Sequence, residues 1–236
     1  MQSNSLQPKN LNAQIVDALG QRIIQGHYVT GEQLPIEAEL CQEFGVSRSI
    51  MREATKILMA KGLVVSRPRV GTLVKSRECW NLLDSDVLSW VTESLPEEEF
   101  LDMLFEARMA LEPSAAELAA TKASAKDIQA IASAYTDMAK AGTMEESLEP
   151  DIRFHQAVMD ATHNDVIRYI GHTLHNALAI SIRLTNWHPD IHALSLPRHE
   201  AVYKAIQAND AQAARNAATI LLNESRQDFN KQKQIS

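Results

Sequence analysis

The order of the elements predicted for the first 75 residues constrains the fold of this chain more than any other feature. Apolar residues that recur every three or four positions predict three helices, over 11–24, 36–44 and 48–61. Two short β-prone runs follow, 63–66 and 72–74, and a turn with a basic tip separates them. Helix, helix, turn, helix and hairpin is the order of a winged helix-turn-helix, so we expect that domain over residues 1–76.

Beyond residue 75 the pattern is helical, apart from a joining segment that contains Trp80 and Trp90. Six more helices are predicted, over 97–121, 124–142, 145–162, 164–186, 196–208 and 210–232. Long helices with short connections favour an antiparallel bundle. We therefore expect a mainly α fold, with the winged domain, a joining segment over 77–95 and an all-helical domain over 96–236.

Capping residues and prolines mark the ends of the predicted helices. Ser124, Asn164 and Asp210 are suited to accept backbone N–H bonds at three helix starts. Pro189 and Pro197 are expected between helices, where a missing N–H costs nothing.

Charge is distributed unevenly along the chain. Residues 1–80 contain 10 basic and 7 acidic side chains, a net of +3, whereas the whole chain has 23 and 30, a net of −7. The remainder therefore carries 13 basic and 23 acidic residues, a net of −10. A small basic module on an acidic body suits a protein whose N-terminal domain binds nucleic acid.

Membrane and disulfide-rich classes are excluded by the sequence. No apolar run approaches the roughly 20 residues that span a bilayer, and the first ten residues lack the apolar core of a signal peptide. The two cysteines, Cys41 and Cys79, form neither a disulfide framework nor a C-x-x-C knuckle. We expect a cytoplasmic protein without a membrane partner.

The third predicted helix has one apolar and one basic face. At about 100° per residue, one arc of the helical wheel holds Ile50, Met51, Ala54, Ile57 and Leu58. A separate arc holds Arg48, Ser49, Arg52 and Lys56. Such a helix fits the major groove of DNA, and Arg67 and Arg69 at the hairpin tip could contact phosphates or the minor groove. By the helical wheel alone, a solvated basic face is the more ordinary interpretation.

Four runs make the interpretation specific: GEQLPIEAEL at 31–40, FGVSRSIMREA at 44–54, KGLV at 61–64 and GTLV at 71–74. Together they resemble the DNA-binding domain of the GntR family of transcription regulators. The resemblance implies double-stranded operator DNA as the partner, bound by a homodimer. It assigns base contacts to Arg48 and Arg52, a polar groove contact to Ser49, and wing contacts to Arg67 and Arg69.

Two positions depart from the pattern of that family. Ala38 stands where many members have an arginine that contacts DNA, so the preferred operator sequence is expected to differ. Ile36 replaces the usual small capping residue, which should slightly weaken the start of the second helix.

A candidate metal site lies in the predicted bundle. Asp151 and His155 are four residues apart on one helix, so both side chains can point at the same spot. A carboxylate and an imidazole can hold a metal together, and His199 on a later helix is the natural third ligand. By spacing alone, a histidine hydrogen-bonded to an aspartate on a helix surface is the more ordinary interpretation.

A second resemblance bears on this site. The run DIRFH at 151–155 is similar to the D-x-x-F-H motif of the FCD effector domain, and 198–206 and 106–113 resemble two further segments of it. The resemblance implies a divalent metal held by Asp151, His155 and His199, with zinc, nickel and manganese not distinguished. Members that bind metal usually have another histidine where this chain has Leu221.

The effector implied by the resemblance is a small carboxylate. Arg108 is the candidate clamp, since guanidinium pairs bidentately with carboxylate; its alternative is a salt bridge with Glu106 or Glu112. The segment 80–90 resembles that of sugar-acid regulators, which implies a repressor of an operon for an aldonate such as galactonate, released from DNA by the sugar acid.

Three other functions remain open at this point. The same architecture could respond to a different organic acid, or the helical domain could be a dimerisation scaffold without an effector. An enzyme would use the three metal ligands to activate water. Since no residue is available as a dedicated general base and the DNA-binding domain would be unexplained, we expect no enzyme and no catalytic residues.

Overall fold

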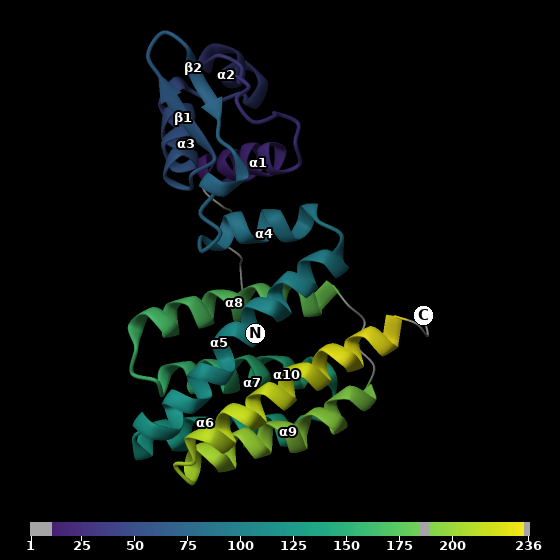
Figure 1. Ribbon diagram of the computed structural model, residues 1–236. Helices are drawn as coiled ribbons and strands as arrows, with labels where there is room; N and C mark the ends of the chain where they lie inside the picture. The colour runs from purple at the N-terminus through teal and green to yellow at the C-terminus, as the bar shows by residue number, and fades with distance from the viewer. Residues whose placement is uncertain (1–10, 185–188, 234–236) are drawn as a thin grey trace, which may run out of the picture. The chain divides into compact units, whose positions relative to one another are not determined.

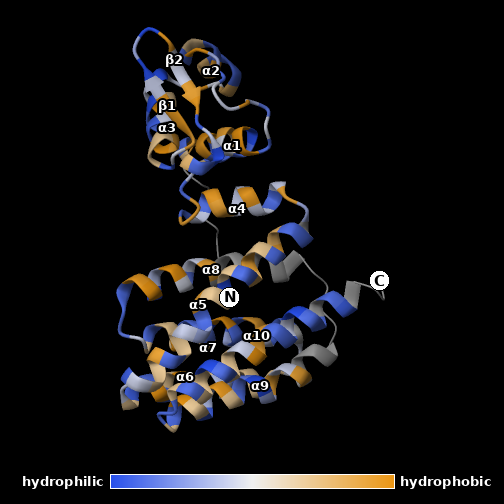
Figure 2. Cartoon of the chain, viewed as in Figure 1, coloured by the Kyte–Doolittle hydropathy of each residue, from blue (hydrophilic) through white to orange (hydrophobic). Residues whose placement is uncertain are grey.

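The computed structural model describes residues 11–184 and 189–233 (Figure 1). The chain forms two compact units that divide between Leu95 and Pro96, called here the N-terminal and C-terminal units. Hydrophobic and hydrophilic residues are interspersed along the described helices (Figure 2). The predicted fold class is confirmed: a winged helix-turn-helix followed by an all-helical bundle.

The N-terminal unit contains the elements in the predicted order. They are α1 (Leu11–Ile24), α2 (Glu37–Phe44), α3 (Arg48–Ala60), β1 (Val64–Arg67), β2 (Gly71–Val74), the 3-10 turn η1 (Arg77–Cys79) and α4 (Ser85–Ser94). The two strands pair antiparallel from Val64 opposite Val74 to Arg67 opposite Gly71. This hairpin is the wing.

The core of the N-terminal unit contains the predicted apolar face of α3. Met51, Ala54 and Leu58 are fully buried and pack with residues of α1, and Ile50 and Ile57 are half-buried at the edge. Ser47 caps the helix, because its hydroxyl accepts the N–H of Ile50 at 3.4 Å. The helical wheel therefore assigned the buried face correctly.

The start of α2 is stabilised in spite of Ile36. This residue offers no side-chain acceptor, but the carboxylate of Glu39 accepts the backbone N–H of Ile36 at 3.1 Å. One of the two bonds of a capping box is thus present, which limits the expected weakening of the helix start.

Helix α4, which was not predicted, forms within the joining segment. Asp84 caps α4 by accepting the N–H groups of Asp86 and Val87. Trp90 on α4 packs over Gly20 of α1 and donates its indole N–H to Asp17 at 2.7 Å. The 77–95 segment is therefore packed on the N-terminal unit through α4.

The contact between Gly20 and Trp90 predicts that Gly20→Ala lowers stability, the opposite of the usual effect of Gly→Ala in a helix. A Cβ atom at Gly20 would overlap the Trp90 ring. In an exposed helix Gly→Ala is stabilising by about 1 kcal/mol, but here it should be destabilising by about 1–3 kcal/mol through overpacking. Urea unfolding of Gly20→Ala would measure this. The destabilisation should vanish when Trp90→Leu is the background, and a Gly20→Ala variant as stable as wild type would contradict the packing.

The C-terminal unit is a bundle of helices. They are α5 (Glu97–Lys122), α6 (Ala125–Lys140), α7 (Met144–Asp160), α8 (Asp165–Leu184), α9 (Pro189–Gln207) and α10 (Ala211–Lys233). Within the bundle, the most extensive packing joins α10 to α5 and α9, and α6 to α7. Phe154, fully buried on α7, lies in the centre of the bundle core.

Three of the predicted helix starts are capped as expected. Ser124 and Asp127 form a reciprocal capping box, Asn164 accepts two N–H groups at the start of α8, and Asp210 accepts the N–H of Ala213 at 2.9 Å. The end predicted for the α8 helix at residue 186 lies outside the described residues. Among the helices that are described, none is long and apolar enough to cross a membrane.

The prediction that Pro189 and Pro197 lie between helices was wrong, because both belong to α9. Helix α9 begins at Pro189, seven residues before the predicted start at 196, and Pro197 lies inside it. Pro189 at the first position needs no N–H partner. Pro197 costs one helical hydrogen bond, and the packing of α9 on α6 and α10 holds the helix continuous.

Candidate DNA-binding face and metal site

The residues predicted to contact DNA are all exposed in the N-terminal unit. Arg48, Ser49, Arg52 and Lys56 lie on the solvent side of α3. Arg67 ends strand β1, and Arg69 sits in the turn of the wing with a positive φ of 63°. The geometry is suitable for a helix in the major groove and a basic wing beside it.

Two ion pairs on α3 were not anticipated from the sequence. Nε of Arg52 lies 2.7 Å from the carboxylate of Glu37 on α2, and Nζ of Lys56 lies 2.8 Å from Glu53. The first pair joins α2 to α3 through Nε of Arg52 on the exposed side of the unit.

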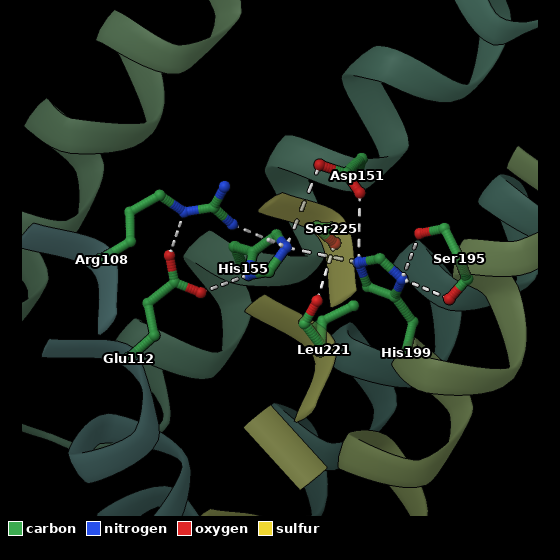
Figure 3. Close-up of polar contacts among 8 residues, drawn as sticks. All are labelled: Arg108, Glu112, Asp151, His155, Ser195, His199, Leu221 and Ser225. Carbon is green, nitrogen blue, oxygen red and sulfur yellow. Dashed lines mark hydrogen bonds and ion pairs between the residues drawn. The ribbon is translucent and has the colours of Figure 1, made fainter. Parts of the chain in front are cut away.

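In the C-terminal unit, the three predicted metal ligands come together from two helices (Figure 3). Asp151 and His155 lie on α7, and His199 lies on α9. Nε2 of His155 is 3.3 Å from Nε2 of His199. Oδ1 of Asp151 is 3.1 Å from Nε2 of His199, and its Oδ2 is 4.0 Å from Nε2 of His155.

The far side of each imidazole faces a hydrogen-bond acceptor. Nδ1 of His155 lies 2.8 Å from the carboxylate of Glu112 on α5, and Nδ1 of His199 lies 2.9 Å from the backbone carbonyl of Ser195. Both nitrogens must carry a proton to donate to these oxygens. Nε2 of His155 is thereby left to present a lone pair, the usual arrangement of a histidine that binds a metal, whereas Nε2 of His199 lies 3.1 Å from Oδ1 of Asp151.

Burial and charge favour the protonation states that metals prefer at two of the candidate ligands, His155 and Asp151. Burial lowers the pKa of His155, against the opposing effect of Glu112, so the imidazole is neutral at pH 7. Burial by itself would raise the pKa of Asp151, but a hydrogen bond from His199 and the positive charges around it keep that pKa well below normal. A neutral imidazole and an ionised carboxylate are the ligand forms of these side chains.

The distances fit a single ion. Two nitrogens each about 2.1 Å from one metal, at angles between about 90° and 110°, lie about 3.0–3.4 Å apart. The separation of 3.3 Å between the two Nε2 atoms falls in this interval. Within the described residues, these three side chains form the one group of His, Cys, Asp or Glu with this convergence.

Arg108 on α5 takes part in both arrangements considered from the sequence. It is 4% exposed, and its Nε donates to Glu112, which is the salt bridge of the alternative interpretation. Its Nη2 also lies 3.3 Å from Nε2 of His155, so the guanidinium reaches the candidate metal position. Leu221 on α10 is buried and lines the apolar wall behind His155.

Sequence reasoning missed the two residues that face the imidazole Nδ1 atoms. Glu112 had been considered as a partner of Arg108, not of His155, and the carbonyl of Ser195 had not been considered. The i, i+4 spacing of Ser195 and His199 was a usable signal. The contact between Glu112 and His155 depends on how α5 packs on α7, and spacing could not reveal it.

Comparison with known proteins defines the family. The model described as bacterial regulatory proteins, gntR family, matches residues 11–74, and the FCD domain model matches 103–224. The chain belongs to the GntR family. It is a DNA-binding transcription regulator with a winged helix-turn-helix and an FCD domain, and it is not an enzyme.

Several curated relatives match most of the regulator. It is 37% identical over 216 residues to the galactonate operon transcriptional repressor of Escherichia coli K12, covering 90% of this chain and 94% of the relative. It is 32% identical to the Uxu operon regulator of Haemophilus influenzae, covering 84% and 74%.

The fold also has solved counterparts. A Streptococcus agalactiae GntR structure aligns with a TM-score of 0.53 at 24% identity, covering 92% of this chain and 99% of the other. The structure of Lar, which controls the Listeria monocytogenes agr system, aligns with a TM-score of 0.64 at 19% identity, covering 94% and 98%. At these identities the likeness concerns the fold alone.

Proposed function

We propose that this regulator represses an operon for the breakdown of a sugar acid, an aldonate such as galactonate, and that the sugar acid releases it from its operator in the bacterial cytoplasm. The observation that carries the proposal is the convergence of His155, His199 and the Arg108 guanidinium on one buried position. A relative of similar length bears the name of the galactonate operon, which supports the same ligand class.

The chemistry of the site suits such a ligand. A divalent metal held by Asp151, His155 and His199 would keep open positions for oxygen ligands. A sugar acid offers a carboxylate with a neighbouring hydroxyl, and this pair of oxygens can chelate a metal. The carboxylate would also be within the reach of Arg108, whose guanidinium is suited to pair with it.

DNA binding is proposed to require a homodimer. Two winged units related by a two-fold axis call for two half-sites related in the same way, so the operator should be a short inverted repeat. Arg48, Ser49, Arg52 and Lys56 are proposed to enter the major groove, with Arg67 and Arg69 contacting the flanking backbone or minor groove.

Operator release tests the proposed function directly. An operator selected from random DNA by the purified protein is labelled, and fluorescence anisotropy is followed while aldonates, dicarboxylates and a fatty acyl-CoA are added. We expect galactonate or another aldonate to lower the anisotropy. A decrease with only the dicarboxylates or the acyl-CoA would make the ligand class wrong. No decrease with any ligand, together with no thermal shift, would favour a dimerisation scaffold.

Substitution of Arg52 tests the DNA-binding face. Arg52→Ala should weaken binding to the selected operator by about 5- to 150-fold, because a bidentate contact to guanine is lost, and discrimination should relax at one base pair per half-site. Titration of the operator and its single-base variants measures both effects. Arg215→Ala, which removes the same charge from the C-terminal unit, is the matched control. If Arg52→Ala bound as tightly as wild type, α3 would not lie in the groove as proposed.

A further inference from the structure

Glu112 is a buried carboxylate beside the candidate metal site. It lies on α5, is 5% exposed, and each of its oxygens has a different partner. Oε1 accepts from Nε of Arg108, and Oε2 lies 2.8 Å from Nδ1 of His155 (Figure 3). One buried carboxylate thus contacts both a candidate metal ligand and the candidate effector clamp.

The contact with His155 has a chemical consequence because a carboxylate only accepts hydrogen bonds. A neutral imidazole carries its single proton on one of two nitrogens, and the hydrogen bond made by one nitrogen decides the state of the other. Glu112 therefore keeps the proton of His155 on Nδ1. Nε2, which is 3.3 Å from Nε2 of His199, is left to present its lone pair.

We propose that Glu112 is the positioning residue of this site: it fixes the tautomer of His155 and the direction of Arg108 with a single carboxylate. This inference rests on the metal site of the proposed function. Glu112 itself does not bind the metal, since its oxygens are directed at Nδ1 of His155 and Nε of Arg108. It acts through the two side chains that it orients.

Glutamine is the most informative replacement, because it has the same shape and lacks the second acceptor. Its amide offers one oxygen and one NH₂ group. If the amide oxygen accepts from Arg108, the NH₂ group faces Nδ1 of His155 and favours the tautomer with the proton on Nε2. In that tautomer Nε2 has no lone pair for a metal. If the amide oxygen instead accepts from Nδ1 of His155, the NH₂ group faces Nε–H of Arg108, and neither group can accept a hydrogen bond from the other.

The tautomer can be observed directly in the wild-type protein. Long-range ¹H–¹⁵N spectra of protein labelled at the histidine rings distinguish a proton on Nδ1 from one on Nε2, and the signals of His155 are assigned by their loss in His155→Gln. Spectra are recorded on metal-stripped protein at a pH where the ring is neutral. We expect the Nδ1 form for His155. The Nε2 form in wild type would overturn the proposal.

The Zn²⁺ affinity of Glu112→Gln is the second test of the proposal. Titration with Zn²⁺ against a chromophoric chelator should show a loss of about 10- to 100-fold, the usual effect of removing an outer partner of a metal-binding histidine. The His155 signals should shift toward the Nε2 form at the same time. Glu106→Gln, an exposed carboxylate on the same helix, should leave both measurements unchanged.

The outcomes separate this inference from the proposed function. If wild type binds Zn²⁺ and Glu112→Gln binds it equally well, Glu112 is not a positioning residue, although the metal site stands. If wild type binds no metal, the metal site is wrong, and the tautomer of His155 still tests the role of Glu112. Should Glu112→Gln fail to fold, the wild-type spectrum alone decides.

Discussion

The His199→Ala variant should lose its divalent metal while the N-terminal unit stays folded. His199 is one of the three proposed protein ligands, and its Nε2 lies within 3.3 Å of a donor atom of each of the other two. Because loss of an outer partner already costs about 10- to 100-fold, loss of a direct ligand should weaken retention by more than roughly 100-fold. Elemental analysis after gentle purification and gel filtration measures the bound metal.

A surface histidine provides the control for that experiment. His163 pairs with Asp127 at 2.9 Å outside the metal site, so His163→Ala should retain the metal of wild type. Treatment of wild type with a chelator should reproduce the His199→Ala result. Equal metal content in His199→Ala and wild type would refute the assignment of the ligands, as would an effector response that survives chelation.

The Arg108→Ala variant should bind its operator as wild type does and fail to leave it when the sugar acid is added. Release requires that the ligand prefers the arrangement that does not bind DNA. Roughly 100-fold release corresponds to about 2.7 kcal/mol of coupling, within reach of a metal–carboxylate contact and a guanidinium clamp. Removing the clamp should abolish most of that difference in affinity.

Anisotropy of labelled operator, with and without the aldonate that acts on wild type, measures this coupling. Arg226→Ala removes an arginine that pairs with Asp102 elsewhere on α5, and it should respond like wild type. Because Arg108 is buried and bonded to Glu112, thermal unfolding must show that the variant remains folded. Undiminished release from Arg108→Ala would remove Arg108 from the effector site.

The features that sequence predicted well are those set by neighbours along the chain. The buried face of α3 follows from the helical repeat, and the caps at Ser124, Asn164 and Asp210 follow from residues two or three positions away. Asp151 and His155 were paired for the same reason, since four residues are about one helical turn.

The features that sequence missed depend on packing between distant segments. The continuity of α9 through Pro197 relies on the neighbouring helices, which outweigh the local cost of the proline. Helix α4 is stabilised by the packing of Trp90 over Gly20 of α1, a contact between distant segments. His199 was a candidate ligand from the sequence, but its approach to Asp151 requires α9 to lie against α7, and the partnership of Glu112 with His155 requires α5 to lie against α7.

The docking of α4 also bears on where regulators of this family can be cut and recombined. The indole of Trp90 covers Gly20, and Lys61, at the end of α3, bonds to Asp84 and Asp86 at 2.6 and 2.8 Å. A chimera joined after residue 76 would pair this α1 with a foreign α4, leaving a buried lysine without its carboxylates. A junction after Leu95 would keep α4 together with the α1 and α3 on which it packs, so the contacts of Trp90 and Lys61 would be preserved.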